Sequence, residues 1–508
     1  MKTPLNITLG IPGNSENALS STILGMSAAF QFAQRIEFSP EDSDALLREI
    51  PAAPGVLALR GADARSEPYL TRTADLRRRV RRLLAPPEAL NEDGTPILSK
   101  RLNLRERVRW IEYTRTGSDF ESTLVLYHAA HTAFGAEEAR RRLRLHAPTF
   151  LRVTMENAYP RVYATNRLSK KALAEAFGPF PSRAAADRYC DAVLDLFQIR
   201  RCHEELEPYP EHPGCVYGEM KKCMAPCKAG AMQNSTREEL DARYAAESQR
   251  VFSFFNTRGR SMLDEIAAAR EAASEAMDFE QAAALHKQWE KVRGASLLAD
   301  EIVRPVTELR ALVIQEAAPS EDDSAQDNAA IFLLAHGRIA GPEMLSTLGV
   351  RAVREQTAVG SSLFAQPLML APVPLEETAA EEPSTLTPED RARAVLATLE
   401  SQADAMPEIA GMCDYLSLFR RWYYRPEKQR VGEVLLPNAE EEWSVRRLLN
   451  AAARVVLGPP AAAPPVDREG AKDLKTKILH EGREGVEREV PVLPKRSRKA
   501  VTPADLAK

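Results

Sequence analysis

Four of the six cysteines in the chain lie close together in one loop-rich stretch. They are Cys202, Cys215, Cys223 and Cys227. A disulfide framework would need an oxidising compartment, which nothing in the sequence indicates. Four thiolates suit zinc or iron, because four sulfur ligands complete the coordination of either. The paired Cys-x2-Cys knuckles of zinc sites are missing, and an irregular loop can enclose more than one ion. His203 and His212 could replace a cysteine ligand, and four reduced, unliganded thiols are the alternative.

A second chemical feature is a group of arginines accompanied by a single acid, Asp75. The group consists of Arg72, Arg77, Arg78, Arg79, Arg81 and Arg82, and Arg140, Arg141, Arg142 and Arg144 form another. Clustered arginines can bind the phosphates of a nucleic acid, although the net charge of the whole chain is −4. A charged helix face turned to water has the same composition. Charge alone leaves both interpretations open.

The third feature is the run EAASEAMDFEQAAALHKQWEKV, residues 271–292, in which a short turn joins two helical segments. Phe279 would offer an aromatic anchor at the tip of such a hairpin, with Asp278 and Glu280 on either side. Ala282 and Ala283 are small enough to let the two helices pack closely. The alternative is an ordinary helical hairpin that buries Phe279 in its own core.

These residues need elements to position them, and 508 residues are enough for about three domains. We expect strands at 54–59 and 68–70, an arginine-rich helix at 74–84, a strand at 108–116 and a helix at 119–134. A helix at 183–199, capped by Ser182, leads to the cysteines, and helices at about 235–273 and 279–297 follow them. Residues 305–458 mix strand patterns with a helix near 440–457.

The sequence therefore predicts an α+β multidomain protein. We expect an N-terminal extension (1–48), a small α/β domain (49–147), a Cys-rich linker (148–234), a helical hairpin (235–300), a mixed α/β region (301–458) and a disordered tail (459–508). No apolar run reaches the roughly 20 residues that span a bilayer. The N-terminus lacks the continuous apolar core of a secretory signal. We expect a cytoplasmic protein with no membrane partner.

Residues 177–230 resemble part of a known family. The run FGPFPSRAAADRYCDAVLDLFQIRRC, with CVYGEMKKCMAPCKAG after it, resembles the linker of the UvrC subunit of the bacterial UvrABC excision-repair nuclease. In that family the four cysteines hold a 4Fe-4S cluster, so the resemblance implies that these four thiols are its ligands, with zinc as the alternative cofactor. The run around Phe279 is similar to the UVR motif, which docks on the UvrB subunit. The resemblance implies binding of a UvrB-like protein through Asp278, Phe279, Glu280 and Ala283.

Residues 54–84 are similar to the opening of the GIY-YIG endonuclease domain with which UvrC proteins begin. Such a domain cuts a phosphodiester with a tyrosine as proton acceptor, basic side chains and one glutamate that holds a divalent metal. The resemblance places Tyr69 and Arg79 at catalytic positions. It implies DNA binding by Arg72, Arg77, Arg78 and Arg81. Leu57, Thr71 and Leu83 depart from the family pattern, and Arg72 stands where a lysine is usual.

The metal ligand departs further from the pattern. The run ESTLVL, residues 121–126, places Leu126 where the family has its glutamate, and leucine cannot coordinate a metal ion. A shifted alignment would offer Glu121 or Asp119 instead. Residues 416–437 resemble the segment before the second, RNase H-type nuclease of the family, so we expect a truncated RNase H-like region.

The resemblance implies a UvrC-like protein of nucleotide excision repair that binds a UvrB-like partner and DNA without cutting. Two alternatives belong to other classes. One is an active GIY-YIG endonuclease that incises DNA beside a lesion with a divalent metal. The other is a zinc-stabilised binding module.

Overall fold

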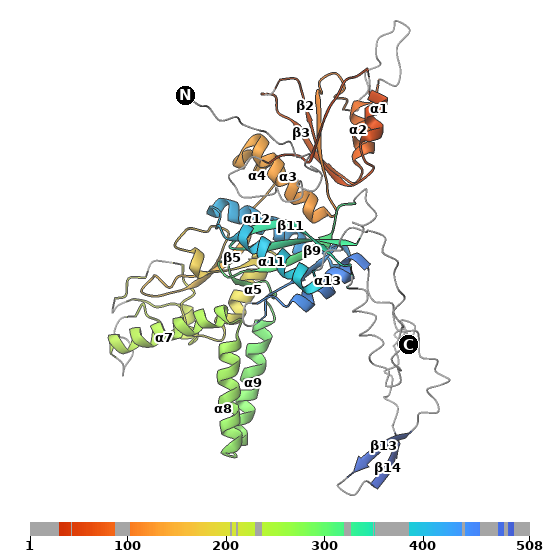
Figure 1. Cartoon of the computed structure of the whole chain (residues 1–508). Helices are drawn as coiled ribbons and strands as arrows, with labels where there is room; N and C mark the ends of the chain where they lie inside the picture. The colour runs from red at the N-terminus through yellow and green to blue at the C-terminus, as the bar shows by residue number, and fades with distance from the viewer. Residues whose placement is uncertain are drawn as a thin grey trace, which may run out of the picture. The chain divides into compact units, whose positions relative to one another are not determined.

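The structure is a computed structural model of the whole chain. It describes all residues except 1–29, 42, 64, 87–101, 204–205, 210–211, 229–235, 320–326, 349, 351–385, 439–441, 458–475, 482–485 and 492–508. The chain divides into two units, Met1–Leu457 and Gly458–Lys508. Within the described residues the fold is mixed α and β, with four separate sheets (Figure 1). No helix in this part of the chain is both long and apolar enough to span a membrane.

The first sheet has the strand order β1-β4-β2-β3, and every neighbouring pair is antiparallel. Its strands are β1 (Gln34–Glu37), β2 (Gly55–Arg60), β3 (Tyr69–Thr73) and β4 (Trp110–Arg115). The helices of this region are α1 (Ser43–Glu49), α2 (Leu76–Leu84), α3 (Asp119–Phe134) and α4 (Ala136–Leu143). The strands β2 to β4 and the helices α2 and α3 confirm the elements expected there. The sequence did not predict β1 and α1. Strand β1 lies within the range expected to be an N-terminal extension, and α1 ends one residue beyond it.

Helix α2 shows why this region folds as it does. Its N-cap is Asp75, whose carboxylate accepts a hydrogen bond from the backbone N–H of Arg78. The apolar positions Leu76, Val80 and Leu83 are buried against Leu57 of β2. The arginines of the helix therefore lie on the faces that do not pack against the core.

The second sheet has the order β6-β5-β7-β8 and leads into the cysteine segment. Its strands are β5 (Thr149–Val153), β6 (Val162–Thr165), β7 (Ala176–Phe180) and β8 (Arg304–Pro305), with a 3-10 turn at Leu173–Glu175. Helix α5 (Arg183–Leu194) begins at the predicted cap, because the Ser182 hydroxyl accepts from the N–H of Ala185. The helix ends at Leu194, short of the predicted residue 199.

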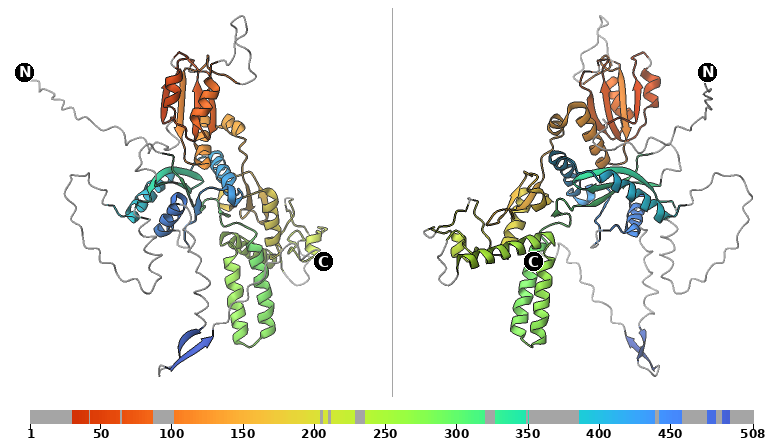
Figure 2. Two further views of the ribbon diagram at one scale, coloured as in Figure 1. Left: turned by 90° about the vertical axis from the view of Figure 1, so that its right-hand side faces the viewer. Right: turned by 60° about the vertical axis from the view of Figure 1, so that its left-hand side comes forward.

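The helical part follows the cysteines. It contains α6 (Val216–Glu219), α7 (Arg237–Asn256), α8 (Arg260–Glu275) and α9 (Phe279–Ser296). The prediction of one helix over 235–273 is wrong, because the chain turns between α7 and α8. Gly259 adopts a φ of +83°, and the preceding Arg258 also has a positive φ of 55°, which ends an α-helix. Helices α8 and α9 run side by side as a hairpin in all views (Figures 1 and 2).

The third sheet has the order β11-β10-β9-β12, again with antiparallel neighbours. It contains β9 (Ala311–Glu316), β10 (Asn328–Ala335), β11 (Arg338–Ser346) and β12 (Glu433–Leu435). The helices here are α11 (Pro388–Ala403), α12 (Ile409–Tyr423) and α13 (Val445–Leu457), with a 3-10 turn at Glu427–Gln429. Leu399 of α11 and Leu448 of α13 pack with Ile331 of β10 in one buried cluster.

The second unit contains one described feature, an antiparallel strand pair. Strands β13 (Thr476–Glu481) and β14 (Val486–Pro491) pair from Thr476 with Pro491 to Glu481 with Val486. This pair lies within the range expected to be a disordered tail.

Candidate functional site

The structure brings together the two residues expected at catalytic positions. Tyr69 opens β3, and Arg79 lies on α2, one turn of helix beyond the Asp75 cap. The guanidinium Nη2 of Arg79 donates a hydrogen bond of 2.6 Å to the phenol oxygen of Tyr69. A strand and a helix from one small core thus hold a phenol and a cation in direct contact. Such a pair is suited to bind and orient a phosphate group.

The acids that could hold a divalent metal have other partners. Asp119, in the first turn of α3, accepts from Arg72 on one side and from Arg425 on the other, the latter at 2.6 Å. Glu121 is buried and accepts from the backbone N–H of Gly117 at 2.7 Å. Burial raises the pKa of Glu121 to about 7, although the hydrogen bond from Gly117 lowers it. Leu126 lies half-buried on α3 and has no ligand atom.

The arginines expected to bind DNA fall into two groups. Arg77 is tied to the protein, because its guanidinium donates to the carbonyl oxygens of Ile50 and Arg48. Arg72 is exposed but holds Asp119 and Thr123. Arg78 and Arg81 are exposed on the outer face of α2, together with Arg82, which belongs to the same arginine cluster. These last three form the basic surface that remains open to a phosphate backbone.

The four cysteines of the loop-rich stretch lie in one electrostatic neighbourhood. Burial raises the pKa of Cys223 to about 11, and the nearby thiols of Cys215, Cys202 and Cys227 raise it further, against a hydrogen bond from Ala225 that lowers it. Burial also raises the pKa of the Cys227 thiol, with contributions from Cys215 and Cys202. These thiols, spread over the loop in sequence, therefore lie near enough in space to act on the charge of Cys223 and Cys227.

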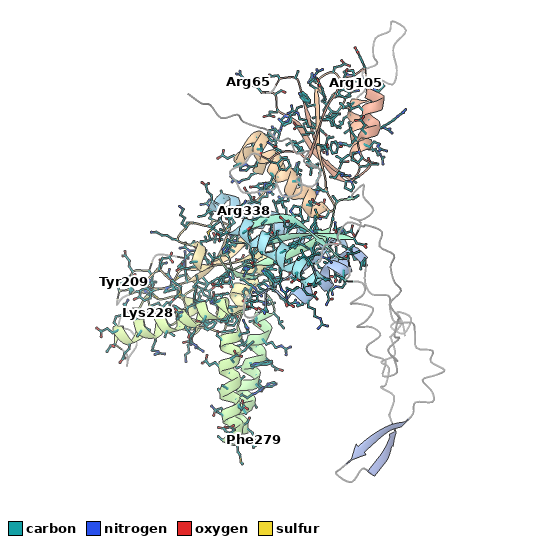
Figure 3. The ribbon with its side chains drawn as sticks, viewed as in Figure 1. Arg65, Arg105, Tyr209, Lys228, Phe279 and Arg338 are labelled. Atoms are coloured by element: carbon teal, nitrogen blue, oxygen red, sulfur yellow. The ribbon has the colours of Figure 1, made fainter. Side chains whose placement is uncertain are left out.

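Backbone contacts close the ends of this stretch against each other. Tyr209 and Lys228, both labelled in Figure 3, form a parallel backbone bridge. The Tyr209 N–H donates to the carbonyl oxygen of Cys227 at 3.3 Å. Gly214 has a φ of +80°, and a Cβ there would lie 2.1 Å from Cε of Lys228. The left-handed backbone therefore favours glycine in the turn before Cys215, whereas the flexible end of Lys228 could move away from a larger side chain.

The two histidines offered as substitute ligands are engaged elsewhere. Nδ1 of His203 lies 2.8 Å from the guanidinium of Arg161. Nδ1 of His212 accepts from the backbone N–H of Gly214 at 2.9 Å, and the ring packs on Tyr209. The cysteines are the better ligand candidates in this stretch.

Two polar groups of the chain reach the sulfur atoms of these cysteines. The Ala225 N–H donates to Sγ of Cys223 at 3.3 Å, and a guanidinium nitrogen of Arg200 lies 4.0 Å from Sγ of Cys202. Amide–sulfur hydrogen bonds and nearby cations stabilise the negative charge of metal-bound thiolates. In a tetrahedral zinc site with bonds of about 2.3 Å, the sulfur atoms would lie about 4 Å apart. Across the described residues, no three Cys, His, Asp or Glu side chains surround a point where one metal ion could sit.

The tip of the α8–α9 hairpin exposes the residues expected to bind a partner. Phe279 begins α9 and its side chain is 72% exposed, and the neighbouring Met277 is 77% exposed. Figure 3 shows Phe279 at the free end of the hairpin. Asp278 is the N-cap of α9 and accepts from the N–H of Gln281 at 3.0 Å. The alternative that Phe279 is buried in the core of its own hairpin is therefore wrong.

The other residues expected to bind a partner are also open to solvent. Glu280 and Ala283 are not buried, and both lie in the first turns of α9. Met277 adopts a positive φ of 58° in the turn between the two helices. Its apolar side chain is exposed beside Phe279. An exposed pair of large apolar side chains at a helix tip is unusual for a surface without a partner.

Comparison with known proteins finds relatives that share the part of the chain containing the four cysteines. A family profile described as the UvrC/Cho excinuclease middle domain matches residues 149–248, from β5 into α7. The UvrABC system protein C of Actinobacillus succinogenes is 28% identical over 252 residues, which cover 50% of this chain and 38% of that protein. The protein of the same name from Desulforudis audaxviator is 26% identical over 346 residues, 65% of this chain and 51% of its own length. The chain is UvrC-like.

The matches also show how much of its length the chain shares with these relatives. The UvrABC system protein C of Pseudomonas syringae pv. syringae is 32% identical over 133 residues, which are 26% of this chain and 20% of that protein. The UvrC-like chain thus spans between 20% and 51% of the length of these three relatives. No solved structure matches it.

One polar contact that sequence patterns did not predict joins distant parts of the UvrC-like chain. Asp414 of α12 is buried and accepts from Arg140 of α4 at 2.8 and 2.9 Å and from the Tyr127 hydroxyl of α3 at 3.0 Å. Burial raises the pKa of Asp414, although Arg140 lowers it. Arg140 was expected to be a phosphate-binding candidate, and here its guanidinium neutralises a buried acid. The partners are 274 residues apart, so no local pattern could have revealed them.

Proposed function

We propose that this UvrC-like chain acts in nucleotide excision repair as a factor that binds a UvrB-like protein and DNA without cutting the DNA. The single observation that carries this proposal is the exposed Phe279 at the end of the α8–α9 hairpin. The relatives named above are UvrABC system proteins, which supports a role in the same process. A cytoplasmic location accompanies the proposal.

Docking through the hairpin has a clear physical basis. Phe279 and Met277 together offer apolar surface that water covers in the free chain. Aromatic side chains of this kind are frequent anchors of protein interfaces. Asp278 and Glu280 flank the anchor with two negative charges, one of which also caps α9. A partner with an apolar pocket rimmed by basic residues would complement this tip.

The cysteine segment is proposed to hold a 4Fe-4S cluster. Cys202, Cys215, Cys223 and Cys227 would be its ligands, as the resemblance to UvrC proteins implies, and the nearness of Cys202 and Cys215 to Cys223 and Cys227 supports this choice. Such a cluster supplies one-electron redox chemistry when it is bound. The chain itself contributes the amide of Ala225 as a donor to one sulfur and burial of two thiols. Zinc is the alternative occupant.

Loss of cutting is proposed from the acids of α3. Leu126 cannot bind a metal ion, Asp119 is held between two arginines, and Glu121 is buried against a backbone amide. The exposed arginines of α2 and the Tyr69–Arg79 pair would still contact phosphate. That pair is the one observation in favour of an active endonuclease, because it retains the expected proton acceptor and its cation.

The proposal is tested by capture of a purified UvrB-like protein on the full-length chain. Phe279→Ala should weaken the Kd by more than about fivefold, which corresponds to about 1 kcal/mol. Leu297→Ala is the matched control, since Leu297 follows the other end of α9 and is 73% exposed. Equal binding by the wild type and both variants would rule out docking through the hairpin tip.

A further inference from the structure

A cavity with a volume of about 540 Å³ lies at one end of the first sheet, where β2 ends and β4 begins. Six of its lining residues carry the argument: Phe30, Phe32, Arg35, Arg60, Trp110 and Glu112. Neither the Tyr69–Arg79 pair nor any cysteine lines it. Its size falls in the range of sites for small organic ligands.

The polar wall of the cavity is a carboxylate shared by two guanidiniums. Glu112 of β4 is buried, with 11% of its side chain exposed. The Nε of Arg60 donates to one carboxylate oxygen at 2.6 Å, and the Nε of Arg35 lies 3.5 Å from the other. A guanidinium carries five N–H donors, and these contacts use only the Nε side of each. Among the described residues, the terminal nitrogens of both groups have no other hydrogen-bond partner, so they can reach a second anion although Asp63 also lines the cavity. Two such guanidiniums together suit a phosphate.

The second wall is aromatic. The guanidinium carbon of Arg35 lies 4.2 Å from the centroid of the Trp110 ring. Phe30 and Phe32 pack edge to face, with centroids 5.1 Å apart. Only 6% of the residues in the chain are aromatic, so three of them around one cavity is a concentration. Arginines beside aromatic rings are the combination with which proteins hold a nucleotide, the cations on the phosphate and the rings against the base.

We propose that this cavity binds one nucleotide, with the phosphate at Arg35 and Arg60 and the base against the aromatic side chains. A free mononucleotide and an unstacked unit of single-stranded DNA present the same phosphate and ring. The inference goes beyond the proposed function, because nucleotide binding here requires neither the hairpin tip nor the cysteine segment. It can therefore fail or succeed independently of docking on a UvrB-like protein.

The test is a titration of the full-length chain with two probes. One probe is deoxyadenosine monophosphate, followed by calorimetry, and the other is a fluorescein-labelled oligodeoxythymidine, followed by anisotropy. Arg35→Gln should weaken binding by about tenfold, because it removes a charge-assisted contact to phosphate. The variant should fold, since Arg35 is 56% exposed on an edge strand and Glu112 keeps Arg60 as its partner.

Arg109→Gln is the matched control. Arg109 is 52% exposed, pairs with Glu37 and does not line the cavity, so its loss changes the net charge equally. Phe32→Ala provides a second variant of the site and should weaken binding without any change of charge. Binding of the mononucleotide that depends on Arg35 would identify a free nucleotide as the ligand, and such binding of the oligonucleotide alone would identify a single strand. Equal losses with Arg35→Gln and Arg109→Gln, or no binding of either probe, would overturn the proposal.

Discussion

The buried carboxyl group of Glu121 makes the folding of α3 dependent on pH. Its pKa is raised from 4.5 to about 7, chiefly by burial. Between pH 4.5 and about 7, the folded chain therefore keeps a proton on Glu121 that the unfolded chain releases. The free energy of unfolding is highest below pH 4.5 and falls as the pH rises through about 7. At 1.36 kcal/mol per pKa unit, the loss is about 3 kcal/mol.

Glu121→Gln should remove this dependence. Glutamine keeps an oxygen that can accept from the Gly117 N–H, and it cannot ionise. We expect the variant to match the wild type near pH 4.5 and to exceed its local stability by about 3 kcal/mol at pH 8.

Amide exchange of the full-length chain measures this effect directly. Protection of the first turns of α3 would be compared at pH 5 and pH 8 after correction for the intrinsic exchange rate. Glu138→Gln is the control, because Glu138 on α4 is half-buried and hydrogen bonds from Arg141 and Arg142 lower its pKa to about 2, outside this range. Equal protection of wild-type α3 at both pH values, or a Glu121→Gln variant as sensitive as the wild type, would refute the reasoning.

Two further predictions concern the cysteines and the buried acid of α12. Cys223→Ser should prevent the visible absorbance of an iron–sulfur centre after anaerobic reconstitution with iron and sulfide, whereas Cys190→Ser, in the core of α5, should leave it intact; equal absorbance in both variants would contradict the ligand assignment. Asp414→Ala should lower the free energy of unfolding by about 3 kcal/mol, because it leaves the Arg140 guanidinium without its partner. Urea denaturation measures the loss, and Asp187→Ala, on the exposed side of α5, is the control that should show little change. Equal urea midpoints for the wild type and Asp414→Ala would contradict this prediction.

Local patterns predicted those parts of the fold that local physics determines. The apolar spacing of α2 and the cap at Ser182 both follow from hydrogen bonds and burial within a few residues. The break between α7 and α8 was missed because Gly259 was not recognised as the left-handed residue that ends a helix. Strand β1 was missed because its exposed residues show little apolar alternation and its pairing with β4 is not local.

The candidate site divides in the same way. The sequence selected Tyr69 and Arg79, which the structure places in contact, because their spacing resembles a known motif. It could not reveal that Asp119 is held by Arg425, since that partner lies just beyond the end of α12, far away in the sequence. Whether the guanidinium of each arginine is paired within the protein or exposed to solvent depends on tertiary packing. Clustering of charge in the sequence does not determine it.

One measurement tests the central claim most directly. A lesion-bearing duplex preloaded with a UvrB-like protein would be incubated with the full-length chain and Mg²⁺ or Mn²⁺, alongside a variant that combines Tyr69→Phe with Arg79→Ala. We predict that the chain binds the complex and that no strand is cut by either protein. Incision by the wild type that vanishes in the variant would contradict the account and would show that Tyr69 and Arg79 take part in cutting.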